Sequence, residues 1–522
     1  MSLLNLNFHP EQLKQVEQTF YVVINAESLK LLRVEQLTSA DSAASIKGII
    51  PAIALNSLGD QSFCRDHAIR YAYVGGSMAK GISSVAMVKA LGHAGMLGFF
   101  GAAGLSLEQV ESAIDELQSE GKDFPFGVNL IHSPNEPELE KALIDLYLRK
   151  QVRLVEASAF MALSLPIVRY RTAGLYRDSS GRVVAPNRVI AKVSREEVAA
   201  RFMSPPPEKM LKQLVASGDL TVEQAELAKE ISMAQDITVE ADSGGHTDNR
   251  PALALFPTIK AQANAIQGQF NYPQPLRVGL GGGIATPASA VAALSMGAAY
   301  LVTGTVNQAC VESGTCDAVR QMLAETRQAD ITMAPSGDMF ELGVKVQVVK
   351  RGTMFSIRAH KLYDLYKAYN SMDALPVDER EKLEKTFFHA PLNTIWEQTR
   401  NYFAVRDPRQ VEKAEADPKY KMALVFRWYL GQSPVWANQG EPSRKIDYQI
   451  WCGPAMGAFN EWVKGSFMEA PEARKVVDVA YNILFGAAVM MRINLLKQQG
   501  VAIDDANLVA PLQVEKIKEF LS

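Results

Sequence analysis

The sequence predicts an α/β protein: a (β/α)8 TIM barrel followed by a C-terminal α-helical domain. From Tyr71 to Val302, short apolar segments alternate with helical segments of about ten to fifteen residues, the pattern of a parallel sheet covered by helices. The apolar segments number eight, and glycine-rich turns follow the last two. Eight strands favour a closed barrel. An open doubly wound sheet is the alternative, and the clustering of glycine turns on the last two strands argues against it.

Length and composition limit the possible functions. A chain of 522 residues is too long for one compact core, so two or three domains are expected. The net charge of −3 gives no electrostatic reason to expect nucleic acid. The four cysteines form no CxxC pair, so we expect no disulfide framework, no metal site and a reduced, cytoplasmic chain. The N-terminus lacks a signal-peptide pattern, and the apolar run at Phe485–Met491 is too short to cross a membrane.

The chain divides at two changes of pattern. Residues 1–66 form a mixed N-terminal element, with strands expected at Phe20–Ile24 and Ile49–Ile53. Residues 67–337 form the barrel, interrupted by a hairpin expected from Val168 to Val184 around a polar turn. The eight barrel strands are expected at Tyr71–Val74, Met96–Phe100, Phe126–Leu130, Val152–Glu156, Val189–Val193, Ile237–Asp242, Arg277–Leu280 and Ala299–Val302.

Residues 338–522 are expected to form an α-helical domain after one extended segment at Gly343–Arg351. Helices are expected at Met354–Tyr369, Val377–Phe388, Leu392–Tyr402, Tyr420–Leu430, Ala458–Trp462, Arg474–Lys497 and Leu512–Leu521. All five tryptophans of the chain lie in this domain. Most of them are expected to be core residues, but bulky aromatic side chains would also suit a tunnel for an acyl chain.

The turns after the last two barrel strands predict a phosphate site. One strand ends in Gly281, Gly282 and Gly283, and the next ends in Gly304 and Thr305. Thr286 and Pro287 then suit the start of a helix. Glycines expose backbone N–H groups, and a helix N-terminus attracts anions, so two such turns side by side favour phosphate over ordinary loops.

Other strand ends add polar groups, because barrel enzymes carry their chemistry at this end of the strands. Asn129 suits a cofactor edge, although it could also cap a turn. Lys192 lies in an apolar strand and needs an anionic partner, for which Glu156 is a candidate. His246 could act in turnover or only cap its loop. The full set is Gly75, Gly76, Ser77, Met78, Asn129, Glu156, Lys192, Gly244, Gly245 and His246.

Several stretches resemble a known family. Val239–Thr247, Val278–Ile284 and Leu301–Thr305 resemble the FMN-dependent nitronate monooxygenase and enoyl reductase barrels. Further stretches resemble the trans-acting enoyl reductases (PfaD type) of polyunsaturated fatty acid and polyketide synthases: Arg188–Ser194, Asp242–Asp248, Lys345–Phe355 and Arg358–Tyr363. The resemblance runs from about Tyr71 to the C-terminus. Asp248 departs from it, because many relatives have glycine there, and this puts the local loop geometry in question.

The resemblance implies an enzyme in which NADPH reduces FMN, and the flavin reduces a 2-enoyl thioester on an acyl carrier protein. It implies that His246 is catalytic, that the substrate is an acyl chain, and that the enzyme is a homodimer without a membrane. The implied FMN-binding residues are Gly75, Gly76, Ser77, Met78, Asn129, Lys192, Gly244, Gly245, Gly281, Gly282, Gly283, Gly304 and Thr305.

Two other function classes remain open. A nitronate-type flavin oxidase would use oxygen as acceptor, but a small nitroalkane needs no helical cap. A non-catalytic subunit would only dock the carrier protein, but it would have no use for the glycine turns.

Overall fold

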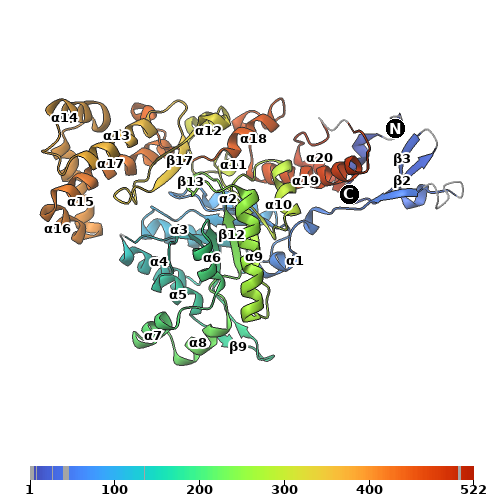
Figure 1. Cartoon of the computed structure of the whole chain (residues 1–522), viewed down its shortest axis with the longest axis horizontal. Helices are drawn as coiled ribbons and strands as arrows, with labels where there is room; N and C mark the ends of the chain where they lie inside the picture. Colours follow the sequence, from blue (N-terminus) through green and yellow to red (C-terminus); the bar gives the residue numbers. More distant parts are fainter. Residues whose placement is uncertain are drawn as a thin grey trace.

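The computed structural model describes residues 5–6, 9–25, 28–38, 46–134, 136–503 and 507–521. Figure 1 shows a barrel in the centre, a group of helices above one end of it, and a small sheet on the far side near the N-terminus.

The barrel is closed, and all of its neighbouring strands are parallel. Its order is β11-β12-β14-β15-β5-β6-β7-β8, and β11 pairs back with β8. This confirms the predicted TIM barrel and rules out the open sheet. The strands are β5 (Tyr73–Gly75), β6 (Leu97–Phe100), β7 (Phe126–Ile131), β8 (Leu154–Ser158), β11 (Arg188–Val193), β12 (Asp236–Glu240), β14 (Arg277–Gly281) and β15 (Leu301–Thr303).

Helices connect the strands and cover the outside of the barrel. They are α2 (Val85–His93), α3 (Leu107–Gln118), α4 (Pro137–Arg149), α5 (Leu165–Thr172), α6 (Glu196–Met203), α9 (Ala252–Phe270), α10 (Pro287–Ser295), α11 (Thr305–Gln308) and α12 (Asp317–Ala324). A short helix α1 (Gln61–Asp66) precedes β5, and the pair α7 (Glu208–Ala216) and α8 (Val222–Leu227) is inserted after α6.

The predicted hairpin at residues 168–184 is only partly correct. Residues 168–171 belong to α5, because the Ser164 hydroxyl accepts the Ile167 N–H and Pro166 lies in the first turn, both helix-start features. The hairpin itself is shorter and pairs β9 (Tyr176–Arg177) with β10 (Val183–Val184).

The N-terminal ends of the strands hold a buried charge network. Arg277 donates from Nε to Asp236 Oδ1 (2.6 Å) and from Nη1 to Asp66 Oδ2 (2.7 Å). His67 Nε2 lies 2.9 Å from Asp236 Oδ2. Burial opposes ionisation of Asp236, but His67 and Arg277 outweigh it and lower the pKa of this carboxyl. The network fastens α1 to β12 and β14.

A three-stranded antiparallel sheet joins the barrel to the region that follows it. Its strands β16 (Ile331–Pro335) and β17 (Lys345–Val349) come after the barrel, and β13 (Gly245–His246) comes from the loop after β12. The expected extended segment at Gly343–Arg351 is therefore confirmed as β17. A helical unit follows, with its own apolar cluster around Phe340, Phe388 and Phe426. Its helices are α13 (Phe355–Ala368), α14 (Val377–Leu383), α15 (Leu392–Arg406), α16 (Pro408–Ala416) and α17 (Pro418–Gln439).

The last helices pack back on the barrel and share its apolar cluster, so the predicted helical domain consists of two separate packing units. They are α18 (Ala455–Val463), α19 (Val476–Gln498) and α20 (Val514–Leu521). The apolar run at Phe485–Met491 is only the middle of α19, and the whole helix is long and apolar enough to cross a membrane. However, 72% of its apolar window is buried inside the protein, as in a core helix.

The N-terminal residues form a small sheet beside α19. Arg492 of α19 donates to the carbonyls of Gln15 and Gln18, which joins this element to the barrel side of the molecule. The strand predicted at Phe20–Ile24 is confirmed, whereas the one predicted at Ile49–Ile53 begins and ends earlier. The strands are β1 (Asn5–Leu6), β2 (Phe20–Asn25), β3 (Ser28–Leu32) and β4 (Ile46–Ile50).

Candidate active site

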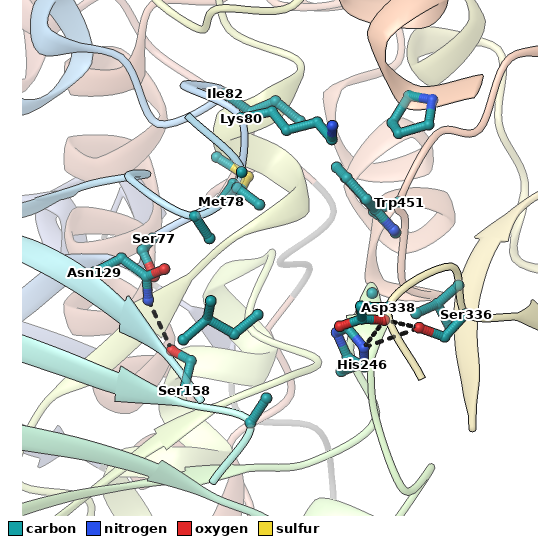
Figure 2. Close-up of a pocket in the computed structure, with 18 of the residues that line it drawn as sticks. Ser77, Met78, Lys80, Ile82, Asn129, Ser158, His246, Ser336, Asp338 and Trp451 are labelled. Atoms are coloured by element: carbon teal, nitrogen blue, oxygen red, sulfur yellow. Dashed lines mark hydrogen bonds and ion pairs between the residues drawn. The ribbon is translucent and has the colours of Figure 1, made fainter. Parts of the chain in front are cut away.

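A cavity of about 740 Å³ lies at the C-terminal ends of the barrel strands. The helical unit forms its other wall, with α15 and α17 contributing Tyr402, Arg406, Arg427 and Trp428. Figure 2 shows labelled residues from the barrel loops facing His246 and Trp451 across this space. Apart from Gly75, all of the residues predicted to bind the cofactor or to act in catalysis line the cavity.

The glycine turns after β14 and β15 present unused hydrogen-bond donors. The backbone N–H groups of Gly283 and Gly304 have no acceptor among the described residues. A Cβ added at either glycine would meet no heavy atom within 4 Å. The nearby Ser243 hydroxyl is buried, and it has no hydrogen-bond partner among the described residues. Open space lined by free donors fits a bound phosphate.

The helix after the first glycine turn offers fewer free N–H donors to a phosphate than its sequence suggested. Thr286 and Ser289 of α10 cap each other's backbone N–H groups, so part of the first turn is already satisfied. The free donors therefore belong to the turns rather than to this helix.

Other glycines of the predicted set are explained by close packing. A Cβ at Gly282 would lie 2.7 Å from the Ala241 carbonyl carbon, and Gly282 has a φ of +82°. A Cβ at Gly244 would lie 2.8 Å from the Cys452 nitrogen. Gly75 packs against Leu91 of α2 and does not line the cavity. These positions need glycine whether or not a ligand is bound.

The loop after β5 is fixed by Glu156. The Ser77 backbone N–H donates to Glu156 Oε2 at 2.9 Å, and the Ser77 hydroxyl donates to the same oxygen. Asn129 is buried, and its Nδ2 donates to the Glu156 carbonyl (3.2 Å) and to Ser158 Oγ (3.0 Å). Figure 2 shows the bond between Asn129 and Ser158 at the cavity wall. Asn129 thus joins β7 to β8 and also faces the cavity.

Lys192 has two carboxylate neighbours rather than the one expected. Its Nζ lies 3.3 Å from Glu240 Oε1 and 3.9 Å from Glu156 Oε2. Burial alone would lower the pKa of Lys192, but the two carboxylates outweigh it and raise the pKa. Lys192 is therefore a fixed cation in the cavity wall, and sequence reasoning missed Glu240 as its nearer partner.

His246 lies on β13 and forms a pair that the sequence did not reveal. Its Nε2 lies 3.1 Å from Asp338 Oδ1 and 3.2 Å from Ser336 Oγ, as Figure 2 shows. Burial would lower the pKa of His246, but the Asp338 carboxylate outweighs it and raises the pKa. Nδ1 has no partner among the described residues, so a protonated ring keeps one N–H for a ligand.

Asp248, the departure from the family pattern, has a structural role. Its carboxylate accepts from Arg195 Nε (2.9 Å) and from Ser194 Oγ (2.6 Å). These contacts fasten the loop that carries His246 to the end of β11, so aspartate here does not disturb the cavity.

The comparisons with known families match two parts of the chain. Residues 62–360 match the nitronate monooxygenase family. Residues 369–448 match the inserted helical domain of [acyl-carrier-protein] S-malonyltransferase. The second match corresponds to the helical unit that covers the cavity.

The chain is also similar to biosynthetic proteins. It is 48% identical over 464 residues to one of the subunits of the polyunsaturated fatty acid synthase of Thraustochytrium sp., covering 88% of this chain and 31% of that protein. It is 44% identical over 446 residues to polyketide biosynthesis protein PksE of Bacillus subtilis, covering 85% of this chain and 58% of that one. The chain thus spans between about a third and three fifths of these relatives.

A solved structure agrees with this grouping. The enoyl reductase domain of MlnA, from the macrolactin biosynthesis cluster of Bacillus amyloliquefaciens, is 40% identical, with a TM-score of 0.81. The match covers 85% of this chain and all of that domain. FabK from Thermotoga maritima has the same fold, at 18% identity and a TM-score of 0.50. The chain therefore belongs to the nitronate monooxygenase family and is similar, in sequence and in structure, to the enoyl reductase domain of MlnA within the fold of that family.

Proposed function

We propose that this protein is a flavin-dependent enoyl reductase that reduces the 2,3 double bond of enoyl thioesters on an acyl carrier protein. The observation that carries the proposal is one cavity that joins free phosphate-type donors at Gly283 and Gly304 to the His246–Asp338 pair. The likeness to the MlnA enoyl reductase domain supports the reaction. The fatty acid and polyketide relatives support a synthase as the setting.

FMN is the proposed cofactor. Gly281, Gly283, Gly304 and Thr305 would hold its phosphate, since the free backbone donors and open space at this turn fit a phosphate. Ser77, Met78 and Asn129 would lie along its ring, and Lys192 would place a positive charge at its polar edge. When bound, FMN would supply the hydride for the β-carbon, with NADPH as the proposed source of electrons.

His246 is the proposed catalytic residue. Reduction needs a proton at the α-carbon and a hydrogen-bond donor for the charge that develops on the thioester oxygen. The Asp338 carboxylate at Nε2 stabilises the protonated imidazole and leaves the Nδ1–H available. Asp338 thereby positions His246 and favours its charged form.

The helical unit is the proposed binding wall for the acyl chain and the carrier protein. It covers the cavity with aromatic residues, including Tyr402, Phe403 and Trp428. A nitronate oxidase remains the second candidate because of the family match, but a small nitroalkane has no need of a helical unit with aromatic residues over the cavity. A non-catalytic docking subunit would have no use for the free donors of the glycine turns. A homodimer in the cytoplasm remains a prediction.

The test is an absorption spectrum of the purified protein, followed by anaerobic mixing with NADPH and then with a crotonyl thioester. We expect a yellow protein that releases FMN on heating. NADPH should bleach the visible band, and the thioester should restore it faster than air does. Release of FAD would contradict the cofactor. Bleaching that only oxygen reverses would favour the oxidase, and a colourless protein after reconstitution would favour the docking subunit.

A further inference from the structure

One cation in the cavity wall has no carboxylate partner. Lys80 follows β5 and lines the cavity, and among the described residues no carboxylate lies within 4.0 Å of its Nζ. The other cations of this wall are all paired with carboxylates: Lys192 with Glu240 (3.3 Å), His246 with Asp338 (3.1 Å), Arg406 with Glu136 (2.8 Å) and Arg427 with Glu341 (3.2 Å). Among the cations that line the cavity, Lys80 is therefore the one whose ammonium has no carboxylate partner among the described residues.

The backbone holds Lys80 in place. Its N–H donates to the Ala103 carbonyl (2.7 Å), and the next N–H, of Gly81, donates to the Gly101 carbonyl (2.9 Å). Lys80 has a φ of +58°, an unfavourable conformation for a residue with a side chain. Such a conformation persists only where the surroundings enforce it, and functional sites are among the places where it recurs.

The side chain of Lys80 also has the space it needs to extend into the cavity. Gly104 lies beside it, and a Cβ added there would approach Lys80 Cγ to 3.2 Å and Nζ to 3.8 Å. The absence of a side chain at Gly104 leaves room for the lysine stem. Figure 2 shows Lys80 extended across the cavity on the side of Trp451, above His246.

A second cation stands close to Lys80. Burial lowers the pKa of Lys80, and the positive charge of Arg406 lowers it further. Arg406 belongs to α15 of the helical unit and is already paired with Glu136. The two positive groups therefore come from opposite walls of the cavity, and an anion between them would relieve their repulsion.

We propose that Lys80, with Arg406 beside it, binds a phosphate group of the ligand that enters the cavity from the side of the helical unit. The inference rests on the proposed function, which supplies two sources of this chemistry. One is the phosphodiester of the pantetheine arm that carries the enoyl thioester, and the other is a phosphate of the dinucleotide. Both would bind between a lysine and an arginine as a charge-assisted contact.

The experiment uses the flavin-loaded protein and two thioesters, crotonyl-4′-phosphopantetheine and crotonyl-pantetheine. Lys80→Met removes the charge and keeps most of the stem. For the phosphorylated thioester we expect KM to rise about tenfold with little change in kcat, because one charge-assisted contact is lost. KM for the unphosphorylated thioester should not change, and Lys80→Arg should restore most of the binding.

Lys89→Met is the matched control. Lys89 lies on α2, the helix that follows the same loop, and pairs with Glu116 and Glu120 away from the cavity. Its substitution should leave both KM values unchanged.

The possible results distinguish the two phosphate sources from each other, and other results overturn the proposal. A rise in KM confined to the phosphorylated thioester assigns the pantetheine arm, and a rise confined to NADPH assigns the dinucleotide. An equal change for both thioesters, or no change in any KM, overturns the proposal. Loss of bound flavin also overturns it, since the phosphate would then belong to the cofactor. If the unmodified protein reduces neither thioester, the proposed function fails. Calorimetric titration with 4′-phosphopantetheine and pantetheine still tests Lys80 in that case.

Discussion

The two ends of the barrel differ in whether their polar groups have hydrogen-bond or ion-pair partners. At the N-terminal end, the buried side chains of Arg277, Asp236 and His67 bond to one another. At the C-terminal end, the backbone N–H of Gly304, the hydroxyl of Ser243 and the ammonium of Lys80 have no hydrogen-bond or carboxylate partner among the described residues. Both ends are built from the same strands, so the difference lies in the residues placed at the strand ends.

This difference separates stability from function. Buried polar groups are normally paired, because an unpaired group loses its hydrogen bonds to water without replacement. Paired groups at one end therefore stabilise the fold, and unpaired groups at the other end indicate where a ligand completes the bonding. The same division is general for TIM barrels, whose active sites lie at the C-terminal face. A substitution at one end should therefore change stability, and a substitution at the other end should change ligand binding or turnover.

Asp236→Ala should have the largest effect, and only on stability. It leaves Arg277 and His67 buried without their shared carboxylate, so unfolding should become easier by about 3–5 kcal/mol. The folded-state pKa of Asp236 lies below its unfolded value, so its contribution is present at neutral pH and is lost as pH falls through the folded pKa. Urea denaturation at neutral and acidic pH measures this.

The exposed Asp317, which pairs with Arg320, provides the control for that variant. Asp317→Ala should change stability by less than about 1 kcal/mol. A normal unfolding midpoint in Asp236→Ala, together with lost flavin or activity, would contradict the division between the two ends.

Gly304→Asp should have the next largest effect, and only on flavin binding. Gly304 has a negative φ (−127°), and an added Cβ meets nothing within 4 Å, so the alanine variant separates the effect of a side chain from that of its charge. A carboxylate there would face the phosphate, and flavin affinity should fall by about 100-fold or more. Gly304→Ala should bind flavin nearly normally. Equilibrium dialysis measures the affinity, and full flavin retention in the aspartate variant would refute the phosphate assignment.

His246→Ala should slow turnover by about 10²-fold while leaving flavin bound, if the imidazole is the proton donor. The two half-reactions can be measured separately by stopped-flow absorbance. Loss of only the step with enoyl thioester would support the donor role, and loss of only the step with NADPH would indicate dinucleotide binding. Wild-type rates in both steps would reduce His246 to a loop cap.

Asp338→Asn should have the smallest effect, a shift in the pH profile. The Asp338 carboxylate raises the pKa of His246, so the protonated ring, and with it turnover, declines as pH rises through that raised value. Removing the charge lowers the pKa, so the decline should move to lower pH, while rates at acidic pH stay near wild type. An unshifted profile of kcat would show that His246 protonation does not limit turnover.

Most of the fold could be predicted because buried parallel strands appear as short apolar runs. All eight predicted barrel strands are present, displaced by at most two residues at either end. The error at residues 168–171 arose because the apolar alternation there also fits one face of a short helix, and the Ser164 cap decides between them. The split of the C-terminal helices into two packing units could not be predicted, because helical periodicity does not say which surface a helix covers.

The candidate site was predictable only where it depends on strand ends. Asn129, Lys192 and His246 all line the cavity, because each lies at or just after the end of a predicted strand. Asp338 was not found, since it is 92 residues from His246 and meets it only through the sheet that joins β13, β16 and β17. Lys80 could not be predicted, because its lack of a carboxylate partner among the described residues and its position near Arg406 depend on residues that are distant in the sequence.

The helical unit begins and ends beside the same strand, β17 of the three-stranded sheet. The Val349 N–H donates to the Ile450 carbonyl (2.9 Å), and the Cys452 N–H donates to the Gln347 carbonyl (3.2 Å). The helical unit is thus an insertion of about 100 residues whose two ends are hydrogen-bonded to each other. Domains are readily inserted where the ends lie this close together. A barrel of this kind can gain, lose or exchange such a unit without any change in the order of its own strands, so the wall over the cavity can vary while the strand ends stay the same.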